Sequence, residues 1–434
     1  MSVAETDTAR AARAGRIHAA MPEGGLFAGK EWRVAAEPFV LPPGAAGELE
    51  KLGFRLRKFL EAANLLYRLS AAGKQPSWIA ELLDRGKPPE LIELARAKAL
   101  GGQIPVVIRP DLILTEGGFA IAEIDSVPGG IGLTAWLNEV YAAEGFPVLG
   151  GAQGMIEGFR AVCAEGEIAV SPEADDYRPE MEWIAPRIGA RVVDAADLTA
   201  DASGAVYRFF ELFDLPNIPG SMDLLRAVAE GRRPMTPPPK PWLEEKLLFA
   251  LFWLRPLAEF WRREIGEKHF LELQKVIPRT WLMDPQPLPP TAVIPGLEIQ
   301  SWEELKKFSQ RERELVVKIS GFSELAWGSR SVRVGQDMSQ EDWTRAIDTA
   351  LGDWTTRPWI LQKFHHARVV EMDYAEGGSM VRTKGRVRLC PYFFCGERET
   401  RLGGVLATVC PADKKLLHGM KDAILAPSVS ARPA

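Results

Sequence analysis

The stretch Ile108–Thr134, IRPDLILTEGGFAIAEIDSVPGGIGLT, decides how this chain folds. Two apolar-rich runs without helical periodicity, Ile104–Leu114 and Phe119–Ile124, lie on either side of the turn-forming sequence EGG. Such a pattern predicts a β-hairpin. A glycine-rich segment follows the second run and leads into a helical pattern, TAWLNEVYAAEG. We therefore expect a strand, a tight turn, a second strand and a glycine-rich entry into a helix.

The charged residues of the predicted hairpin are expected to gather in one patch. Side chains alternate between the two faces of a strand, so Arg109 shares a face with Asp111, and Glu123 shares one with Asp125. If the loop is the three-residue kind centred on Gly117, Asp111 lies opposite Glu123 and Arg109 lies opposite Asp125. The sequence thus predicts three carboxylates and one guanidinium on a single face.

Such a patch suggests a metal site. Like charges that face each other across two strands are destabilising. A hard cation such as Mg²⁺ would relieve this repulsion, because it takes oxygen ligands from one or two carboxylates and from substrate phosphates. The alternative is a solvent-exposed polar hairpin face without function. The glycines after the second strand favour the site, since they let a ligand approach the backbone closely.

Size and composition narrow the class of protein. With 434 residues, the chain is long enough for two or three domains and a large core. Its 53 basic and 58 acidic residues give a net charge of −5, which does not indicate a nucleic-acid partner. The closest of its four cysteines, Cys390 and Cys395, have no second pair at zinc-ligand spacing. We expect a reduced, cytoplasmic protein without a disulfide framework.

No segment predicts a membrane partner or a secretory leader. The longest conspicuous apolar run, Leu247–Leu254, is far too short to cross a bilayer. The first 25 residues include Glu5 and Asp7 and contain no apolar core of the kind that signal peptides need. We expect a loose tail there.

The first half of the chain is expected to hold helices and then a small α/β unit. Within residues 45–100, apolar positions recur at three- and four-residue spacing, and Gly73 is a plausible helix stop. Residues 155–230 show the order strand, helix, strand, which is the sign of an α/β unit. Proline-rich connectors at Arg233–Trp242 and Asp284–Pro290 mark boundaries. Helical patterns lie between them, at Leu243–Phe252 and Pro256–Lys275.

The last third of the chain contains a second group of polar residues. A strand, RELVVKISG, carries Lys318 near its end, and buried lysines need a partner. The following segment, GFSELAWGSRSVRVG, has the glycines of a hairpin whose backbone N–H groups turn toward phosphates. An ordinary surface hairpin is the alternative. A capped helix, Ser339–Gly352, and an apolar strand, Pro358–Phe364, come next, and the end of that strand suits a hinge that meets a purine.

This order of elements resembles the nucleotide site of the ATP-grasp enzymes. Most ATP-grasp chains carry their metal ligands, a Glu-x-Asn strand, near the C-terminus, where this sequence has no such pair. The sequences Arg109-Pro110-Asp111 and Glu123-Ile124-Asp125 supply the equivalent near the N-terminus. The arrangement is similar to the circularly permuted ATP-grasp domain of the glutathionylspermidine synthase family, over residues 104–410.

The resemblance implies an α/β (α+β) fold with a circularly permuted ATP-grasp domain. It implies a helical N-terminal region and an inserted small unit that resembles a pre-ATP-grasp domain. The predicted parts are the helical region with its loose tail, the metal and substrate part, the inserted unit and the nucleotide-binding part, at residues 1–100, 101–150, 151–232 and 240–425.

The resemblance also implies roles for single residues. Mg²⁺ would be held by Asp111, Glu123 and Asp125, and Arg109 would meet the transferred phosphate as the catalytic residue. The residues implied to bind ATP are Lys246, Lys318, Gly321, Trp327, Gly328, Gln362 and Lys363, with Lys275 as the alternative to Lys246. The residues implied to approach the acid substrate are Ser126, Gly129 and Gly130.

Two departures from the family pattern limit what is carried over. Asp125 stands where the family usually has Asn, which adds a charge and could change the number or affinity of metal ions. The amidase half of the two-domain members has no room here, because no cysteine precedes Cys163. Glutathione and spermidine are therefore not assumed as substrates.

The sequence thus predicts an ATP-dependent ligase that joins a carboxylate to an amine through an acyl-phosphate. Its cofactors would be ATP and Mg²⁺, and its partners a small-molecule or peptide carboxylate and an amine, without nucleic acid or membrane. An ATP-dependent small-molecule kinase is one alternative. A non-catalytic ATP-binding partner subunit is another, although the intact set of Arg109, Asp111, Glu123 and Lys318 argues against it. Whether the chain forms a homo-oligomer is left open.

Overall fold

The protein is described from a computed structural model, in which two compact units are distinguished. The residues described are 6–27, 31–125, 127–202, 204–326, 330–414, 417 and 422–431. Unit 1 comprises Met1–Phe59, Ala97–Pro239 and Ala367–Ala434, and unit 2 comprises Leu60–Arg96 and Lys240–His366. Each unit combines helices with sheet, so the mixed α/β class predicted from the sequence is confirmed.

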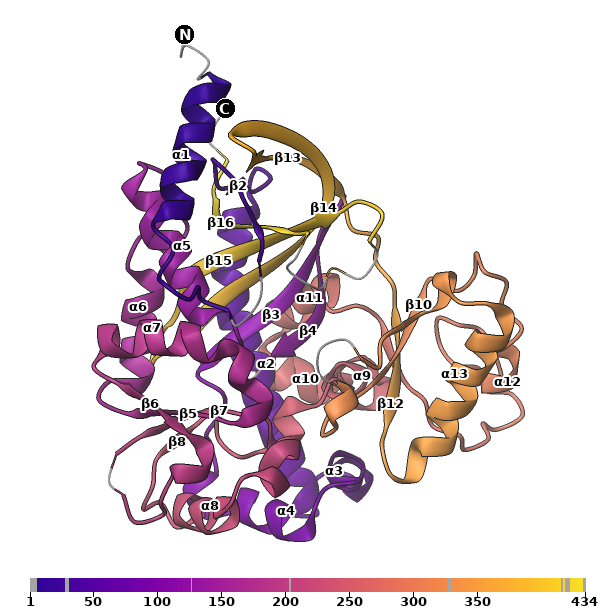
Figure 1. Cartoon of the computed structure of the whole chain (residues 1–434). Coiled ribbons are helices and arrows are strands. Elements are labelled where there is room, and N and C mark those ends of the chain that lie inside the picture. The colour runs from indigo at the N-terminus through magenta and orange to yellow at the C-terminus, as the bar shows by residue number, and fades with distance from the viewer. Residues whose placement is uncertain are drawn as a thin grey trace. The chain divides into compact units, whose positions relative to one another are not determined.

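The main sheet of unit 1 joins strands from opposite ends of the chain (Figure 1). Its strands, in spatial order, are β1 (Arg33–Val34), β16 (Ile424–Val429), β15 (Thr400–Pro411), β14 (Ser379–Cys395), β3 (Val107–Thr115) and β4 (Gly118–Asp125). Two further strands pair at its margins, β13 (Val369–Glu376) with β14 and β2 (Phe39–Val40) with β16. The predicted hairpin is β3–β4, and it therefore lies beside strands from the last sixty residues of the chain.

Helices cover this sheet and connect it to a second one (Figure 1). Helices α5 (Ile131–Ala143) and α6 (Gly154–Cys163) pack on β15, and α7 (Arg178–Ile188) packs on both helices. Their apolar side chains, among them Trp136 and Phe159, form one core with Tyr392 of β14. The tight packing of α5 and α7 fixes the glycine-rich segment that follows the hairpin.

The N-terminal segment is a helix, which corrects the expectation of a loose tail. Helix α1 (Asp7–Ala19) begins after Thr6, whose side chain accepts a hydrogen bond from the Ala9 N–H group. Ala14 and Ile17 are buried on one face. The short apolar stripe of α1 did not suffice to predict a helix from the sequence, because the strands on which it packs, β13 and β14, lie far away in the chain.

The predicted small α/β unit is present as a parallel sheet. Its strands, in spatial order, are β6 (Arg191–Asp194), β5 (Glu167–Val170), β7 (Val206–Phe209) and β8 (Met235–Thr236). Helix α7 connects β5 to β6, and helix α8 (Ser221–Ala229) follows β7. The strand–helix–strand order predicted for this part of the chain is confirmed.

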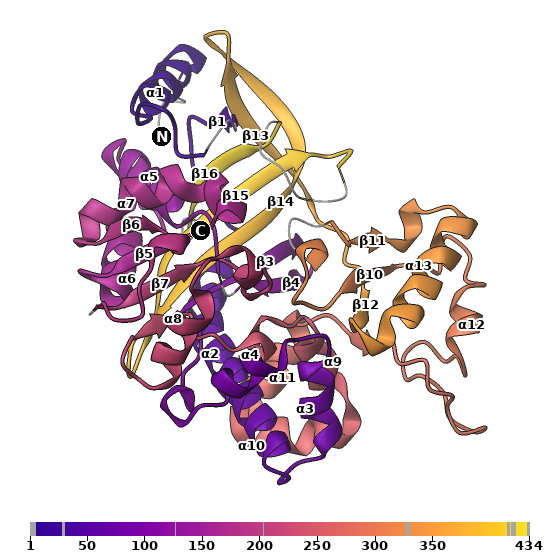
Figure 2. The same cartoon turned by 60° about the horizontal axis from the view of Figure 1, so that its bottom comes forward.

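Unit 2 is built around a four-stranded antiparallel sheet (Figures 1 and 2). Its strands, in spatial order, are β11 (Arg333–Val334), β10 (Leu315–Ile319), β12 (Trp359–Lys363) and β9 (Thr280–Leu282). Helices α13 (Gln340–Gly352) and α12 (Trp302–Leu305) share a core with one face, on which Val317 lies against Trp343 and Ile347. The predicted strand with Lys318 and the predicted strand after it, β10 and β12, are confirmed.

The other helices of unit 2 can be compared with the helices that the spacing of apolar residues predicted. They are the second half of α2 (Ala45–Ala71), α3 (Ser77–Asp84), α4 (Pro89–Ala95), α9 (Leu247–Trp253), α10 (Ala258–Ile265) and α11 (Glu267–Val276). Gly73 follows the end of α2, as predicted, with φ of +71°. The segment Pro256–Lys275 is helical, as predicted, but it is not continuous, because Gly266 at φ +90° divides it into α10 and α11.

Two smaller predictions concern a cap and the membrane. Ser339 caps α13, with its hydroxyl oxygen accepting the Asp342 N–H at 3.0 Å, as the sequence predicts. In the part of the chain that the structure describes, no helix combines the length and apolar character needed to cross a bilayer.

Candidate functional site

The hairpin β3–β4 has the predicted pairing of residues, but its turn is shorter than predicted and its second strand contains a β-bulge. Asp111 lies opposite Glu123, and Arg109 lies opposite Asp125. The turn is two residues long, since Thr115 pairs with Gly118, so the predicted three-residue loop is wrong. A β-bulge at Ala122 inserts one extra residue between the turn and Glu123 and restores the register. Without it, an even turn would place Glu123 on the face opposite Asp111.

Strand β14 adds a third row to the same face. It pairs antiparallel with β3 so that Arg388 lies opposite Ile113, which places Cys390 opposite Asp111. We use the name hairpin cluster for the residues that this face brings together: Arg109, Asp111, Glu123, Asp125, Arg388 and Cys390. Arg388 and Cys390 were not among the predicted site residues.

Ion pairs and hydrogen bonds link five members of the hairpin cluster: Arg109, Asp111, Asp125, Arg388 and Cys390. The two terminal nitrogens of Arg109 donate to Asp111 Oδ1 and to Asp125 Oδ2. Arg388 Nη1 donates to Asp111 Oδ2 at 2.9 Å, and the Cys390 thiol donates to Asp111 Oδ1 at 3.4 Å. Asp111 therefore engages two guanidinium groups and a thiol at once.

The electrostatics of the hairpin cluster follow from burial and crowding. Burial opposes the charged form of Asp111, yet the guanidiniums of Arg109 and Arg388 hold its pKa below the usual value. Burial raises the pKa of Asp125, and the charges of Glu123 and Asp111 raise it further against the opposing effect of Arg109. Perturbed carboxylates of this kind concentrate at functional sites, although structural ion-pair networks produce them too.

The hairpin cluster fits a metal ion only in part. Among the residues that the structure describes, no group of three or more histidine, cysteine or carboxylate side chains is arranged to hold one. Arg109 bridges Asp111 and Asp125 instead. Burial is the main cause of the raised pKa of Asp125, and the neighbouring charges of Glu123 and Asp111 add to it, a repulsion that a cation would relieve. The predicted ligands thus share one face without forming a cage.

The glycine-rich segment after β4 is held by internal contacts. The carboxylate of Glu180, a fully buried residue of α7, accepts the Gly130 N–H at 2.6 Å and the Leu133 N–H at 2.9 Å. The Tyr392 hydroxyl donates to Gly129 O at 2.7 Å. A Cβ atom at Gly129 would overlap the ring of Tyr177. These glycines therefore allow close packing of the protein on itself.

The buried Glu180 has an unusual pKa. Burial raises it from about 4.5 to about 7, although the backbone N–H groups at the start of α5 favour the charged form. The third predicted residue of this segment, Ser126, lies outside the described residues. Glu180 was not among the predicted site residues, because its contacts with the start of α5 depend on how α7 packs against α5.

In unit 2, Lys318 and Gln362 share one face of the antiparallel sheet. Their neighbours along the strands, Val317 and Leu361, belong to the core with α13, so Lys318 and Gln362 point to the opposite face. Both are buried, at 5% and 4% exposure. Lys363, the adjacent predicted residue, is exposed and points to the other face.

The two candidates for the second lysine differ in their surroundings. Lys246 precedes α9, its N–H donates to Ser320 O at 2.9 Å, and its ammonium donates to Ala326 O at 3.2 Å. It therefore contacts the segment that follows Lys318. Lys275 lies on the exposed surface of α11 and pairs with Glu272 of the same helix at 2.7 Å.

The glycine-bearing loop after β10 is described only in part. Gly321 packs against the backbone oxygen of Glu244 and the carboxylate of Glu245. Trp327 and Gly328, which the sequence assigns to ATP, lie outside the described residues. Contact of Trp327 and Gly328 with ATP therefore stays a prediction.

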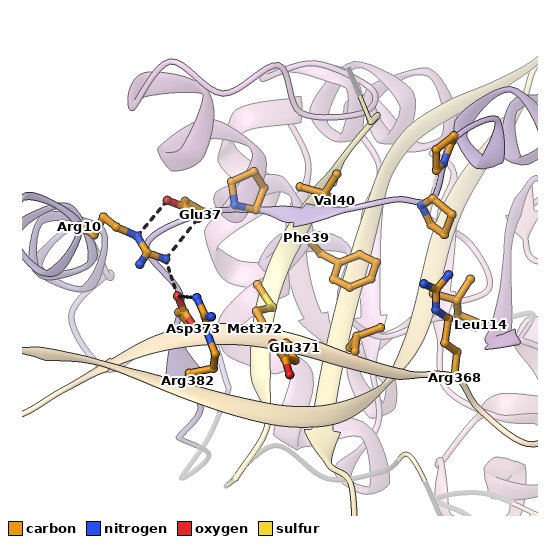
Figure 3. A pocket seen from close by; sticks show the side chains of 14 residues that line it. Arg10, Glu37, Phe39, Val40, Leu114, Arg368, Glu371, Met372, Asp373 and Arg382 are labelled. Carbon is orange, nitrogen blue, oxygen red and sulfur yellow. Dashed lines mark hydrogen bonds and ion pairs between the residues drawn. The ribbon is translucent and has the colours of Figure 1, made fainter. Parts of the chain in front are cut away.

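A separate pocket of about 650 Å³ in unit 1 contains none of the predicted residues in its described lining (Figure 3). Figure 3 shows Phe39 and Met372 between two polar ends. At one end, Arg10 pairs with Glu37 at 3.0 Å and with Asp373 at 2.8 Å. Since these charges neutralise one another, the pocket shows no preference for a charged ligand at that end.

Comparison with known proteins shows a likeness in fold. A glutathione synthetase-like effector from Globodera pallida matches with a TM-score of 0.56 and 11% identity, over 98% of each chain. A protein described as a gamma-glutamylcysteine synthetase from Methylobacillus flagellatus matches with 12% identity over 84% of this chain and 87% of its own, but its TM-score of 0.39 is too low to bear on the fold. No protein-family model matches the sequence, and no similar curated protein was found.

The first of these likenesses, at so low an identity, shows the fold alone. The chain therefore has the fold of a glutathione synthetase-like protein over nearly its whole length. The circular permutation, the ATP-grasp assignment and the particular family stay predictions.

Proposed function

We propose that the chain is an ATP-dependent ligase that joins a carboxylate to an amine through an acyl-phosphate and releases ADP. The observation that carries the proposal is the pairing of Arg109 with Asp125 and of Asp111 with Glu123 on one face of β3–β4. It assembles a guanidinium for the transferred phosphoryl group beside carboxylates suited to Mg²⁺. The fold likeness to a glutathione synthetase-like protein supports the same class.

Nucleotide binding is assigned to unit 2. The buried ammonium of Lys318, on the face shared with Gln362, would contact the phosphates. Lys246 would supply the second contact, because it meets the loop that begins at Gly321. Trp327, Gly328 and Lys363 are retained as further ATP contacts in this proposal.

The position of β3–β4 supports a permuted ATP-grasp arrangement. The hairpin belongs to the same sheet as β14 and β15, although more than 250 residues separate them in the sequence. In a permuted domain, strands that carry metal ligands near the N-terminus would need to join C-terminal strands in this way.

The chemistry at the hairpin cluster would proceed by electrostatic stabilisation. Asp111, Glu123 and Asp125 would hold Mg²⁺, which polarises phosphoryl oxygens when bound. Arg109, buried between two carboxylates, is kept protonated, because those carboxylates raise its pKa against the effect of burial. It would stabilise charge on the phosphoryl group as the acid oxygen attacks.

The acid substrate is assigned to the segment that contains Ser126, Gly129 and Gly130. The N–H groups of Gly130 and Leu133 already bond to Glu180, so these two donors do not serve the substrate in the arrangement described. The segment would instead bind the acid substrate by the shape of its surface. Asp125 Oδ1 accepts the Val127 N–H at 3.0 Å, which fixes the start of the segment beside Asp125.

A trap for the acyl-phosphate tests the proposal. The protein would be incubated with ATP, Mg²⁺, hydroxylamine and a panel of carboxylic acids. An acyl-phosphate is an electrophile, so the right acid should yield a hydroxamate together with one equivalent of ADP. AMP as the product would rule out phosphoryl transfer. ADP with a stable phosphorylated product and no hydroxamate would indicate a kinase, and no ATP turnover with any acid would indicate a binding subunit.

A further inference from the structure

A buried polar group in unit 2 joins the segment after α3 to the start of α9. Lys87 Nζ donates to Glu245 Oε1 at 2.6 Å and to Leu83 O at 2.5 Å. The side chains of Lys87 and Glu245 are 1% and 2% exposed. The other carboxylate oxygen of Glu245 accepts the Ser320 hydroxyl. We use the name Lys87 node for Lys87, Glu245 and Ser320.

The Lys87 node fixes the backbone at Lys246. Ser320 O accepts the Lys246 N–H at 2.9 Å, and Ser320 Oγ accepts the Leu247 N–H at 2.8 Å. The orientation of that hydroxyl is set by Glu245, and Glu245 is held by Lys87. An unbroken series of hydrogen bonds therefore leads from Lys87 to the backbone of Lys246.

The loop that begins at Gly321 rests on the same node. A Cβ atom at Gly321 would lie 2.9 Å from Glu245 Cδ and 2.9 Å from Glu244 O, so the loop leaves β10 in close contact with the node. Lys87 Nζ lies 5.8 Å from the centre of the Phe322 ring. Phe322 adopts φ of +44°, a conformation that a bulky residue keeps only when its surroundings impose it.

The turn that carries Lys87 is itself fixed from the other side. Arg85 Nη1 donates to Trp354 O at 2.9 Å, and its guanidinium lies 4.4 Å from the centre of the Trp354 ring. Gly86, with φ of +74°, lies so close to Thr356 O that a Cβ atom would overlap it. Lys87 is therefore held between the segment before β12 and the start of α9.

A buried ion pair is weak evidence for stability, because the cost of removing two charges from water offsets their attraction. A geometric role explains the Lys87 node better, since its bonds end at the proposed ATP-binding elements. We propose that Lys87 is a positioning residue that sets the place of Lys246 and of the Gly321 loop for ATP. This inference rests on the proposed function and makes α3 and the turn after it part of the nucleotide site.

A paired substitution tests the inference without leaving a buried charge alone. Lys87→Met together with Glu245→Gln removes both charges and nearly keeps both side-chain shapes. ATP affinity would be measured by calorimetry, and amide hydrogen exchange would be followed at Lys246 and Leu247. We expect the thermal midpoint to change little, ATP to bind about tenfold more weakly or worse, and both amides to exchange faster.

A matched control and a second variant complete the test. Arg345→Met removes ion pairs with Glu341 and Asp342 on the exposed surface of α13, away from the node, and should change neither affinity nor exchange at the two amides. If the paired variant does not fold, Ser320→Ala carries the test. It leaves Lys87 and Glu245 in place, removes the acceptor of the Leu247 N–H, and should change affinity and exchange in the same direction.

The outcomes separate this inference from the proposed function. Unchanged affinity and unchanged exchange in a folded variant would overturn the positioning role. A wild-type protein that does not bind ATP would overturn the proposed function instead. In that case the exchange rates at Lys246 and Leu247 still decide whether Lys87 sets the place of this backbone.

Discussion

The two units each contain a buried cluster of charges, and the clusters differ in how completely they are paired. In the Lys87 node, one ammonium meets one carboxylate, and both oxygens of Glu245 accept hydrogen bonds. The hairpin cluster has three carboxylates and two guanidiniums. Among the described residues, the Nε atoms of Arg109 and Arg388 are buried without a hydrogen-bond partner.

Under the proposed function, this difference separates a structural framework, the Lys87 node, from a reaction site, the hairpin cluster. A completely satisfied pair makes its surroundings rigid, whereas buried donors without partners cost stability and need an explanation. Under the proposed function, a ligand that brings phosphate oxygens and a cation would complete the hairpin cluster, whereas no side-chain nitrogen or oxygen of the Lys87 node is buried without a hydrogen-bond partner. Substitutions in the cluster should therefore affect reaction and ligand binding, whereas those in the node should act through geometry.

The largest effect is expected from Arg109→Ala. If Arg109 stabilises the transferred phosphoryl group, turnover in the hydroxamate assay should fall by about 100-fold or more, the scale of losing one preorganised electrostatic group. ATP affinity should change much less, because the interaction is made mainly in the transition state. The measurement is the rate at saturating ATP, below the melting temperature of the variant.

The control for this substitution lies on β14. Arg386 is two residues from Arg388 and donates to Ala412 O, outside the hairpin cluster. Arg386→Ala should leave turnover nearly unchanged. Equal losses in the two variants would show that the rate follows general destabilisation of the sheet, and the comparison between the two clusters would then fail.

The next effect is expected on ATP affinity in unit 2. Lys318→Met keeps the apolar stem and removes the charge, so the dissociation constant should rise about 10- to 100-fold, the range for losing a charged hydrogen bond. Lys246→Met should behave similarly. Lys275→Met should not, because Lys275 pairs with Glu272 on an exposed helix surface. Equal effects at Lys246 and Lys275 would contradict the assignment.

A smaller effect is expected in the dependence of stability on pH, through Glu180. Burial raises its pKa in the folded state from about 4.5 to about 7, so folding favours the protonated form. Its stabilising contribution is complete below about pH 4.5 and is lost as pH rises through 7. At about 1.4 kcal/mol per pKa unit, the loss is at most about 3.5 kcal/mol.

Glu180→Gln isolates this contribution. The free energy of unfolding would be measured in urea from about pH 4.5 to pH 8 for the variant and the wild type. The variant should be less stable at low pH, because the amide cannot accept both N–H groups, but its stability should fall less as pH rises. Glu182→Gln, an exposed position on the same helix, is the control. Parallel curves for Glu180→Gln and the wild type would refute the raised pKa.

Local patterns in the sequence predicted the hairpin cluster better than its turn. The alternation of charges in β3 and β4 gave the correct pairing of Arg109 with Asp125, but the bulge at Ala122 was not foreseen. A bulge depends on the twist of the whole sheet, and no residue type marks it in this sequence. The prediction was right because the extra residue lies in the strand instead of the loop.

Contacts between distant segments could not be predicted. Arg388 joins Asp111 only because β14 pairs with β3 in one particular register, across more than 270 residues of sequence. The contact of the Lys246 backbone with Ser320, on which the proposed preference for Lys246 over Lys275 rests, follows from no periodicity in the sequence. The burial of Glu180 depends on the packing of α7 on α5, which no local pattern in the sequence indicates. In each case the missing information was which segments, far apart in the sequence, pack against each other in the folded chain.

The smallest effect concerns the reactivity of the Cys390 thiol. It tests whether the hairpin cluster is closed to solvent, as the Lys87 node is. Burial, with the charge of Asp111 adding to it, raises the pKa of Cys390 to about 11, and the side chain is 1% exposed. Since the thiolate is the reactive form, iodoacetamide at about pH 8 should leave Cys390 unmodified in the folded protein. Cys395, which is half-buried, should be labelled first.

Mass spectrometry of the peptides would separate the two cysteines, which lie five residues apart. In Cys395→Ser, the described thiols that remain are Cys163, Cys390 and Cys410, all buried, so labelling should be nearly absent until the protein is unfolded. Labelling of Cys390 as fast as Cys395 would show that the hairpin cluster opens readily to water. Water and salt would then screen the ion pairs of the hairpin cluster. The two clusters would differ in their access to solvent, and the difference in hydrogen-bond pairing would no longer explain the comparison.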